Sequence, residues 1–405
     1  MNVFIAILGL AFLILVHEAG HFFIALAVGM RPRRFYVGFP PAIFKTTRKG
    51  IEYGLGMIPL GGYVKIPGMH RLSASDADLY FGRALRQAPE LIGPTQRLKR
   101  ALAAGDDEGA RAALSELTAL GGSNPPEGFE RGVQEILDGL SPDAYWRQRT
   151  WKRIAVILAG PATNLVLAVV LFACVFLVGG GKATRTVNNV LAGRPAAAIG
   201  LRPGDEVIEV NHIKVTPRDI VTRISESHGR PVTLLVHRRS RLVTLGPVRP
   251  QITDRKCRRS CTYRLGFILR GEKLGVGESA WESVKWTGVV TREIGKALGG
   301  LVHGRGRKNI SSPVGIVQGS SDALSHGVQN YLWVLGLISL SLALMNLLPL
   351  LPLDGGHIAF SIVEGVRGRA VAREVYERVS VIGIALVVLL FFVGISNDIS
   401  RLGGG

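Results

Sequence analysis

Cysteine is scarce in this sequence, with three residues among 405. Cys174 lies within a long apolar stretch, whereas Cys257 and Cys261 are four positions apart with no cluster of cysteine or histidine beside them. Structural zinc sites use four such ligands, so this pair does not indicate one. The question whether Cys257 and Cys261 form a disulfide stays open, and such a bond would require that this part of the chain face an oxidising compartment.

Four long stretches are almost free of charged residues, although the formal net charge of the chain is +19. The stretches are Val3–Val28, Ile154–Val178, Tyr331–Leu353 and Val379–Ile395, and only the first contains Asp, Glu, Lys, Arg or His, at three positions. About 20 helical residues cross a hydrocarbon core, with a usual range of about 17–25. We therefore predict four transmembrane helices, which excludes a uniformly soluble protein.

The first apolar stretch could instead be a cleaved signal peptide, because Ala25-Leu26-Ala27 resembles a cleavage site. However, no lysine or arginine precedes the stretch, and cleavage would remove its ionisable residues. We therefore interpret residues 1–30 as the first membrane span.

Basic residues near the span ends predict the orientation in the membrane. They follow the first span, precede the second, and lie between the third and the fourth. In chain order they are Arg31, Arg33, Arg34, Arg147, Arg149, Lys152, Arg153, Arg367, Arg369, Arg373 and Arg378. Short basic flanks remain in the cytoplasm, so both termini of this multi-pass inner-membrane protein are expected outside it. Residues 182–310 hold 25 Lys and Arg against 10 Asp and Glu, but long domains cross largely regardless of charge.

The first span carries His17-Glu18-Ala19-Gly20-His21, an H-E-x-x-H motif. On a helix, two histidines four residues apart project from one face and can bind one zinc ion, with the glutamate between them as general base. Ionisable groups inside an apolar span are costly, which favours a functional role over a polar helix end. We predict that His17 and His21 are zinc ligands and that Glu18 is the catalytic base.

Catalytic zinc takes three protein ligands and leaves a fourth position for water. Asp354 is the predicted third ligand, because it closes the third apolar stretch in the run Asn346-Leu-Leu-Pro349-Leu-Leu-Pro352-Leu-Asp354. The two prolines break the helix, and a broken backbone at membrane depth is tolerated where it lines an enclosed or wet cavity. His357, three residues further on, is an alternative ligand.

The segments between the spans have different patterns. Residues 31–70 are expected to form short strands, residues 71–150 a cytoplasmic helical insert before the second span at 151–180, and residues 181–275 a small β-rich domain. Residues 276–330 are expected to hold an amphipathic helix and a linker, and 331–405 the last two spans. The apolar face of that helix predicts either an interfacial position or a cap on the outer domain.

Six motifs occur in the order typical of one family. They are HEAGH at 17–21, IEYGLGMIPLGGYVKIPG at 51–68, LAGPATN at 158–164, RPAAAIGLRPGDEVIEVN at 194–211, SPVGI at 312–316 and NLLPLLPLDGGH at 346–357. The chain resembles the site-2 protease family of intramembrane zinc metalloproteases, in the bacterial branch with a single PDZ domain. The segment 71–150 matches nothing in that pattern.

The resemblance implies a polytopic α-helical membrane protein of four spans, with a membrane-associated β-hairpin at Ile51–Ile66 and an extracytoplasmic PDZ-like domain. The hairpin would hold an unwound substrate by β-augmentation, although the same pattern also fits an ordinary surface hairpin. The PDZ-like domain would either gate substrates by size or deliver them.

The resemblance also implies a site: Zn²⁺ held by His17, His21 and Asp354, with Glu18 as the base. Asn346 would be catalytic, in contact with the substrate backbone or the oxyanion. Substrates would be single-span membrane proteins already trimmed on the outer side, such as anti-sigma factors, or signal-peptide remnants. The protein would contact the lipid bilayer and no nucleic acid, and its oligomeric state stays open.

The alternative function is a membrane metal transporter or a metal-dependent PDZ scaffold. A transporter would need histidine and aspartate sites along several spans. Apart from the first motif and Asp354, the predicted spans carry no charge.

The orientation predicts which loops are accessible from outside. In a cysteine-free background, a single cysteine at Ser240 should react with an impermeant thiol reagent on intact cells, and one at Ser123 should react only after lysis. The reverse labelling pattern would contradict the orientation and make the basic domain cytoplasmic.

Overall fold

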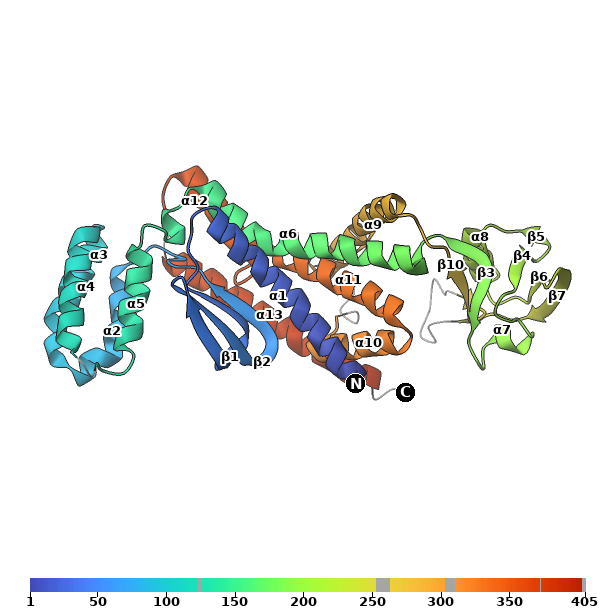
Figure 1. The fold of residues 1–405 in the computed structure, drawn as a ribbon, viewed down its shortest axis with the longest axis horizontal. Coiled ribbons are helices and arrows are strands. Elements are labelled where there is room, and N and C mark those ends of the chain that lie inside the picture. The colour runs from blue at the N-terminus through green and yellow to red at the C-terminus, as the bar shows by residue number, and fades with distance from the viewer. Residues whose placement is uncertain (123–124, 253–262, 303–309, 372, 403–405) are drawn as a thin grey trace. The chain divides into compact units, whose positions relative to one another are not determined.

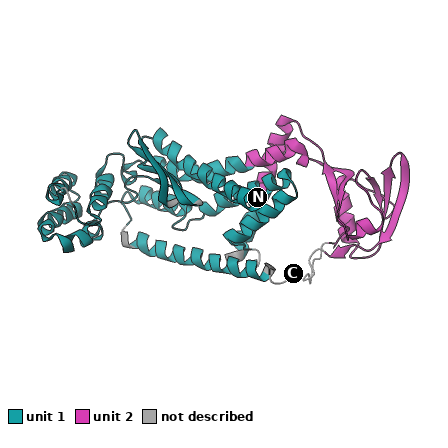
Figure 2. Cartoon of the chain, turned by 60° about the horizontal axis from the view of Figure 1, so that its bottom comes forward, with its two compact units in different colours: residues 1–168, 290–405 teal, residues 169–289 magenta. Residues whose placement is uncertain are grey.

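The computed structural model describes residues 1–122, 125–252, 263–302, 310–371 and 373–402 (Figure 1). Cys257 and Cys261, and with them the question of a disulfide, lie outside these residues. The chain divides into two compact units, residues 1–168 with 290–405, and residues 169–289 (Figure 2).

Four helices among the described residues are long and apolar enough to cross a membrane, which confirms the number of spans expected. They are α1 (Asn2–Ala27), α6 (Thr150–Val175, continued to Gly180 by a π-helical turn), α11 (Val328–Asn346) and α13 (Arg373–Leu402). The third apolar stretch is helical only as far as Asn346, because Pro349 and Pro352 cannot donate hydrogen bonds to a continuing helix.

Small residues let α1 lie directly against α6. A Cβ added at Gly20 would lie 2.6 Å from the backbone oxygen of Ala159, and one at Gly160 would lie 2.3 Å from Nε2 of His21. The hydroxyl of Thr163 bonds the Val16 carbonyl at 3.2 Å. Close backbone approach with hydrogen bonds between helices is how membrane helices associate, since lipid offers no hydrophobic driving force between them.

Helix α11 is fixed to the same pair by two hydroxyl groups. Tyr331 donates to the carbonyl of Ile5 on α1 at 2.8 Å, and Ser339 donates to the carbonyl of Asn164 on α6 at 2.8 Å. Both Ser339 and Asn164 are completely buried. These contacts join three spans into one bundle around the middle of α6.

The segment after α1 forms a single hairpin of two 15-residue strands, β1 (Arg34–Arg48) and β2 (Ile51–Lys65). The expectation of several short strands was therefore wrong, and the stretch matched to a hairpin is one strand of it. Its turn, Lys49-Gly50, has positive φ at both residues, as a type I′ hairpin turn requires.

Strand β2 curls around the start of β1. Residues 34–37 pair with residues 52–55 on one side and with residues 62–65 on the other. Glycine makes the close approach possible, because a Cβ at Gly54 would lie 2.2 Å from the ring of Tyr36. The curl brings the end of β2 beside α1, as Figure 1 shows.

Between the hairpin and α6 lie four helices, α2 (Ala74–Gln87), α3 (Ile92–Ala104), α4 (Asp107–Gly121) and α5 (Phe129–Leu140), with a short 3-10 turn at Pro89–Leu91. They enclose their own apolar core. Its largest buried members are Phe81, Leu91, Leu98, Leu114, Leu117, Phe129 and Ile136.

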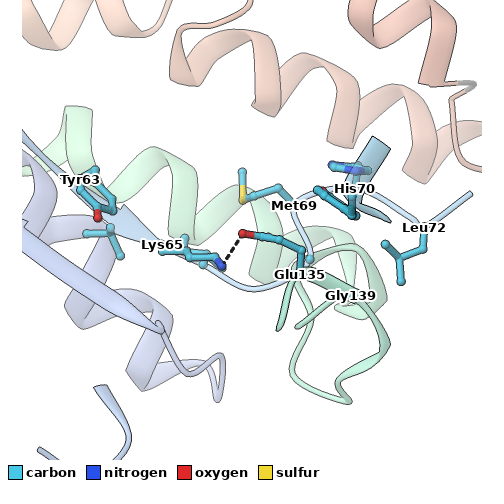
Figure 3. Close-up of a pocket in the computed structure, with 11 residues that line it drawn as sticks. Tyr63, Lys65, Met69, His70, Leu72, Glu135 and Gly139 are labelled. Atoms are coloured by element: carbon cyan, nitrogen blue, oxygen red, sulfur yellow. Dashed lines mark hydrogen bonds and ion pairs between the residues drawn. The ribbon is translucent and has the colours of Figure 1, made fainter. Parts of the chain in front are cut away.

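Buried Asp138 connects the helical insert to the hairpin. Its side chain, 2% exposed, accepts from Nε of Arg33 at 2.8 Å and lies 3.1 Å from Nζ of Lys65. Lys65, the last residue of β2, also pairs with Glu135 of α5 at 2.8 Å, and Figure 3 shows the two side chains pointing toward each other. They line a cavity of about 310 Å³.

The second unit contains an antiparallel sheet of order β10-β3-β4-β6-β7 (Phe267–Gly271, Ala183–Val190, Glu206–Val210, Val232–Arg238 and Arg241–Val248). A short strand, β5 (Ile213–Lys214), pairs with β4, and β8 (Gln251–Ile252) pairs with β9 (Tyr263–Arg264). Helices α7 (Pro195–Ala198) and α8 (Pro217–Glu226) complete its core. Burial alone would raise the pKa of Asp205, but hydrogen bonds from Arg238 and from the Arg202 amide lower it.

The remaining helices are α9 (Val276–Val302), α10 (Pro313–Ser325) and α12 (Asp354–Arg367), with a 3-10 turn at Tyr145–Arg147. On α9, Trp281 and Val284 are exposed while Ser279 and Ser283 are fully buried. An apolar exposed face fits an interfacial position, one of the two alternatives expected for this helix.

The Asp138 contacts predict that the insert and the hairpin stabilise each other. Asp138→Asn should lower the stability of the full-length protein by about 1–3 kcal/mol, because hydrogen bonds to charged groups are lost in a buried position. Its melting temperature in detergent should fall clearly. Asp78→Asn, which removes the exposed pair with Lys99, is the matched control and should change stability by less than about 0.5 kcal/mol. Equal shifts in the two variants would contradict this role.

Candidate metal centre

Two histidines of α1 and one aspartate of α12 converge in the first unit. Nε2 of His17 and Nε2 of His21 are 3.3 Å apart, and Oδ2 of Asp354 lies 3.1 Å from the first and 3.4 Å from the second. All three potential ligand atoms lie within 4.8 Å of one another. Both histidines are 7% exposed, so the cluster is closed off from most of the solvent.

The histidines meet because they are four residues apart on one helical face. Asp354 reaches them because the chain after α11 is non-helical from 347 to 353 and begins α12 at Asp354. The next residue must be glycine: a Cβ at Gly355 would lie 2.3 Å from the backbone oxygens of Leu347 and Leu348. The proline-broken loop and the glycines after it therefore direct the aspartate inward.

Helix α6 orients His21 through its backbone. Nδ1 of His21 donates to the carbonyl oxygen of Val156 at 2.8 Å, and a carbonyl can only accept. The proton is therefore on Nδ1, and the lone pair of Nε2 faces His17 and Asp354. Metal-binding histidines are typically held by such a bond from their other ring nitrogen.

Glu18 lies between this cluster and the hairpin. It is half-buried, and its carboxyl interacts with the backbone amide of Val64 near the end of β2. A Cβ at Gly62 would lie 3.4 Å from Cγ of Glu18, so the strand runs in contact with this side chain. Glu18, the acidic residue of α1 next to the histidines, therefore lies beside the edge of β2.

The donor set fits a zinc ion. Oδ2 of Asp354 is buried and makes no hydrogen bond, although two imidazole nitrogens lie near it. A buried carboxylate oxygen without a partner is costly, and a divalent cation between it and the two nitrogens would remove that cost. Two imidazoles and one carboxylate are also a known ligand set of catalytic zinc, with the fourth position left to water.

The other two sequence candidates lie outside this cluster. His357 faces the hydroxyl of Tyr376 through Nδ1 and borders a separate cavity of about 860 Å³ beside α12. Asn346 is the last residue of α11 and is half-buried. The structure thus brings together His17, His21 and Asp354, with Glu18 beside them, and its geometry gives Asn346 no contact that would define a role.

Sequence reasoning gave no role to LAGPATN, which the structure places against the histidines. Gly160 allows α6 to pass beside both imidazoles, and Asn164 lies one turn further along with its amide 3.3 Å from Nδ1 of His17. The signal available in the sequence was Asn164, a polar residue within a predicted span that carries no charge.

Comparison with known proteins decides the family. The model of peptidase family M50 matches residues 5–390 of this chain. The chain belongs to peptidase family M50. This is the site-2 protease family, so the resemblance of the motifs to that family is confirmed, and the protein is an integral membrane zinc metalloprotease with Zn²⁺ as its cofactor.

Relatives match over almost their entire length. Zinc metalloprotease RasP of Geobacillus kaustophilus is 30% identical over 412 residues, covering 96% of this chain and 95% of the relative. A putative zinc metalloprotease of Agrobacterium fabrum is 29% identical, covering 98% and 95%. The probable protease eep of Enterococcus faecalis is 27% identical, covering 98% of both chains.

The cluster predicts how this M50 peptidase holds its metal. Purified protein should contain about one zinc per chain, and the double variant His17→Ala/His21→Ala should contain almost none, because one carboxylate cannot replace three ligands. His357→Ala is the matched control and should retain the zinc. Metal analysis by mass spectrometry measures all three. Zinc retained in the double variant would overturn the ligand assignment, and zinc lost from the His357 variant would place that residue among the ligands.

Proposed function

We propose that this protein hydrolyses peptide bonds of transmembrane segments at a centre formed by His17, His21 and Asp354, with Glu18 as general base. The observation that carries the proposal is the convergence of the three ligand atoms between apolar spans, with a carboxyl group next to them. Family membership favours a protease over the alternative of a metal transporter or scaffold.

The chemistry follows from the positions of the side chains. Zinc, when bound, supplies a Lewis acid for the scissile carbonyl and lowers the pKa of a bound water. Glu18 takes a proton from the attacking water and returns it to the leaving nitrogen. His17, His21 and Asp354 hold their lone pairs toward one point. Asn346, at the break after α11, donates to the substrate backbone or the oxyanion.

A transmembrane substrate must be unwound first, because its scissile carbonyl is hidden in an intrahelical hydrogen bond. Residues 62–65 of β2 pair with β1 on one side and run beside Glu18 on the other. This edge would hold an extended substrate by β-augmentation, with its scissile bond near the metal. Exposed apolar side chains further along the hairpin, at Ile43, Phe44, Leu55 and Met57, fit a hairpin that dips into the lipid.

The substrates in this proposal are single-span membrane proteins already trimmed on the outer side, in a process of regulated intramembrane proteolysis. The termini and the second unit face outward from the inner membrane, and the helical insert faces the cytoplasm. The small antiparallel sheet with α8 across its core is the basis for a PDZ-like assignment. This domain would exclude substrates that retain bulky outer domains.

The base is tested with Glu18→Gln and two single-span reporters, one trimmed and one with an intact outer domain. The wild-type protein should cleave the trimmed reporter only. Glu18→Gln should retain zinc and lose cleavage by a factor of about 10²–10⁴, because it removes a proton acceptor and no ligand.

Glu364→Gln is the matched control. Glu364 lies on α12, ten positions beyond Asp354, and forms an ion pair with Arg153 of α6 at 2.5 Å. The Glu364→Gln protein should still cleave the trimmed reporter. Activity in Glu18→Gln close to wild type would refute Glu18 as the base. Equal cleavage of the two reporters by the wild type would count against the size filter.

A further inference from the structure

Asn164 is a polar residue that the proposed mechanism does not use. It lies in the middle of α6, is 0% exposed, and its side-chain amide is 3.3 Å from Nδ1 of His17. The other end of the amide, the Oδ1 position, is buried without a hydrogen-bond partner. A buried polar atom without a partner is destabilising, so stability alone would favour an apolar residue here.

The position of Asn164 is set by contacts on both sides. Its backbone carbonyl accepts from Ser339 of α11 at 2.8 Å, and the preceding residue, Thr163, bonds the carbonyl of Val16 on α1 at 3.2 Å. One turn earlier, Gly160 touches both imidazoles, with room for no side chain. The amide therefore faces His17 because α6 is fixed against both neighbouring helices.

The direction of the Asn164–His17 hydrogen bond follows from what a metal ligand requires. If the amide NH₂ donated to Nδ1, the ring proton would be on Nε2, and this nitrogen could not bind a cation. If the amide oxygen accepts from Nδ1–H, the Nε2 lone pair points toward Asp354. Amide oxygen and nitrogen positions are interchangeable assignments, so the second arrangement needs only a rotation of the amide group.

His21 provides an independent comparison. Its Nδ1 faces the Val156 carbonyl, which only accepts, so its Nε2 is free to ligate. Both histidines would then be oriented from α6 in the same way, His21 by the backbone and His17 by the Asn164 side chain.

We propose that Asn164 is a positioning residue whose side-chain oxygen accepts a hydrogen bond from Nδ1–H of His17 and so fixes the tautomer that binds the metal. The inference rests on the proposed metal centre. It gives the LAGPATN motif a physical role: glycine for the approach of α6 and asparagine for the orientation of a ligand.

Three variants of the full-length protein test this proposal, with zinc affinity measured by competition with a chelator. Asn164→Leu, of similar volume, should weaken zinc binding by about 10–100-fold, as removal of such outer partners typically does. Asn164→Asp should bind zinc within about threefold of the wild type, because a carboxylate can accept from Nδ1–H but cannot donate. Tyr331→Phe removes the hydrogen bond between α11 and α1, which does not involve Asn164, and should leave the affinity unchanged.

Two further readouts separate orientation from folding. The metal-free Asn164→Leu protein should melt near the wild-type temperature, because the variant loses the bond to His17 and also removes the buried end of the amide that has no partner. After cobalt substitution, the visible absorption of Asn164→Asp should match the wild type, whereas that of Asn164→Leu should be altered.

The possible outcomes are distinct. Wild-type zinc affinity in Asn164→Leu would overturn the inference, and so would an equal loss in Asn164→Asp, because a carboxylate can accept from Nδ1–H as the amide oxygen does. A loss in Tyr331→Phe as large as that in Asn164→Leu would reduce the role of Asn164 to helix packing. Failure of the proposed metal centre itself would appear differently, as a wild-type protein that binds no zinc.

Discussion

The potential ligand atoms of His17, His21 and Asp354 come from opposite ends of the chain and converge inside an apolar helix bundle. They lie within 4.8 Å of one another. Such a grouping is costly unless a cation is bound by it, because these atoms give up water and Oδ2 of Asp354 finds no hydrogen bond in return. The features around it serve this convergence. Glycine at positions 20 and 160 brings α6 against α1, and the break after α11 turns Asp354 inward.

The hairpin completes the site from the other side. Because β2 curls around β1, its last residues run past Glu18 while Lys65 is held by acidic residues of α5. The strand edge next to the base is thus fixed at one end by ion pairs to the helical insert.

Much of the fold was predictable because its signals are local. Four apolar stretches predicted four spans, and the H-E-x-x-H spacing alone places two histidines on one helical face. Asp354 followed from a proline-broken run that ends at an aspartate. The family resemblance rested on motifs spread over the whole chain. The match of the family model to residues 5–390 confirms the family.

Other features have no local signature. Residues 31–70 were expected to form short strands, not two long ones. Glycine weakens strand propensity, and the pairing of β1 with both ends of β2, which compensates for this, exists only in the folded chain. Spacing alone left His357 open as a ligand, whereas packing turns it toward Tyr376. The contact of Asn164 with His17 joins residues 147 positions apart, and its importance depends on the tautomer of a histidine.

Zinc K-edge absorption spectroscopy of the purified protein tests the metal centre most directly, because it reports the atoms bound to the metal. The ligand set His17, His21 and Asp354 predicts two imidazole nitrogens at about 2.0–2.1 Å, with oxygen at about 2.0–2.2 Å from the carboxylate and a water. A third imidazole would bring His357 into the site in place of Asp354. A sulfur shell at about 2.3 Å would contradict the account altogether, because it would place the metal on cysteine.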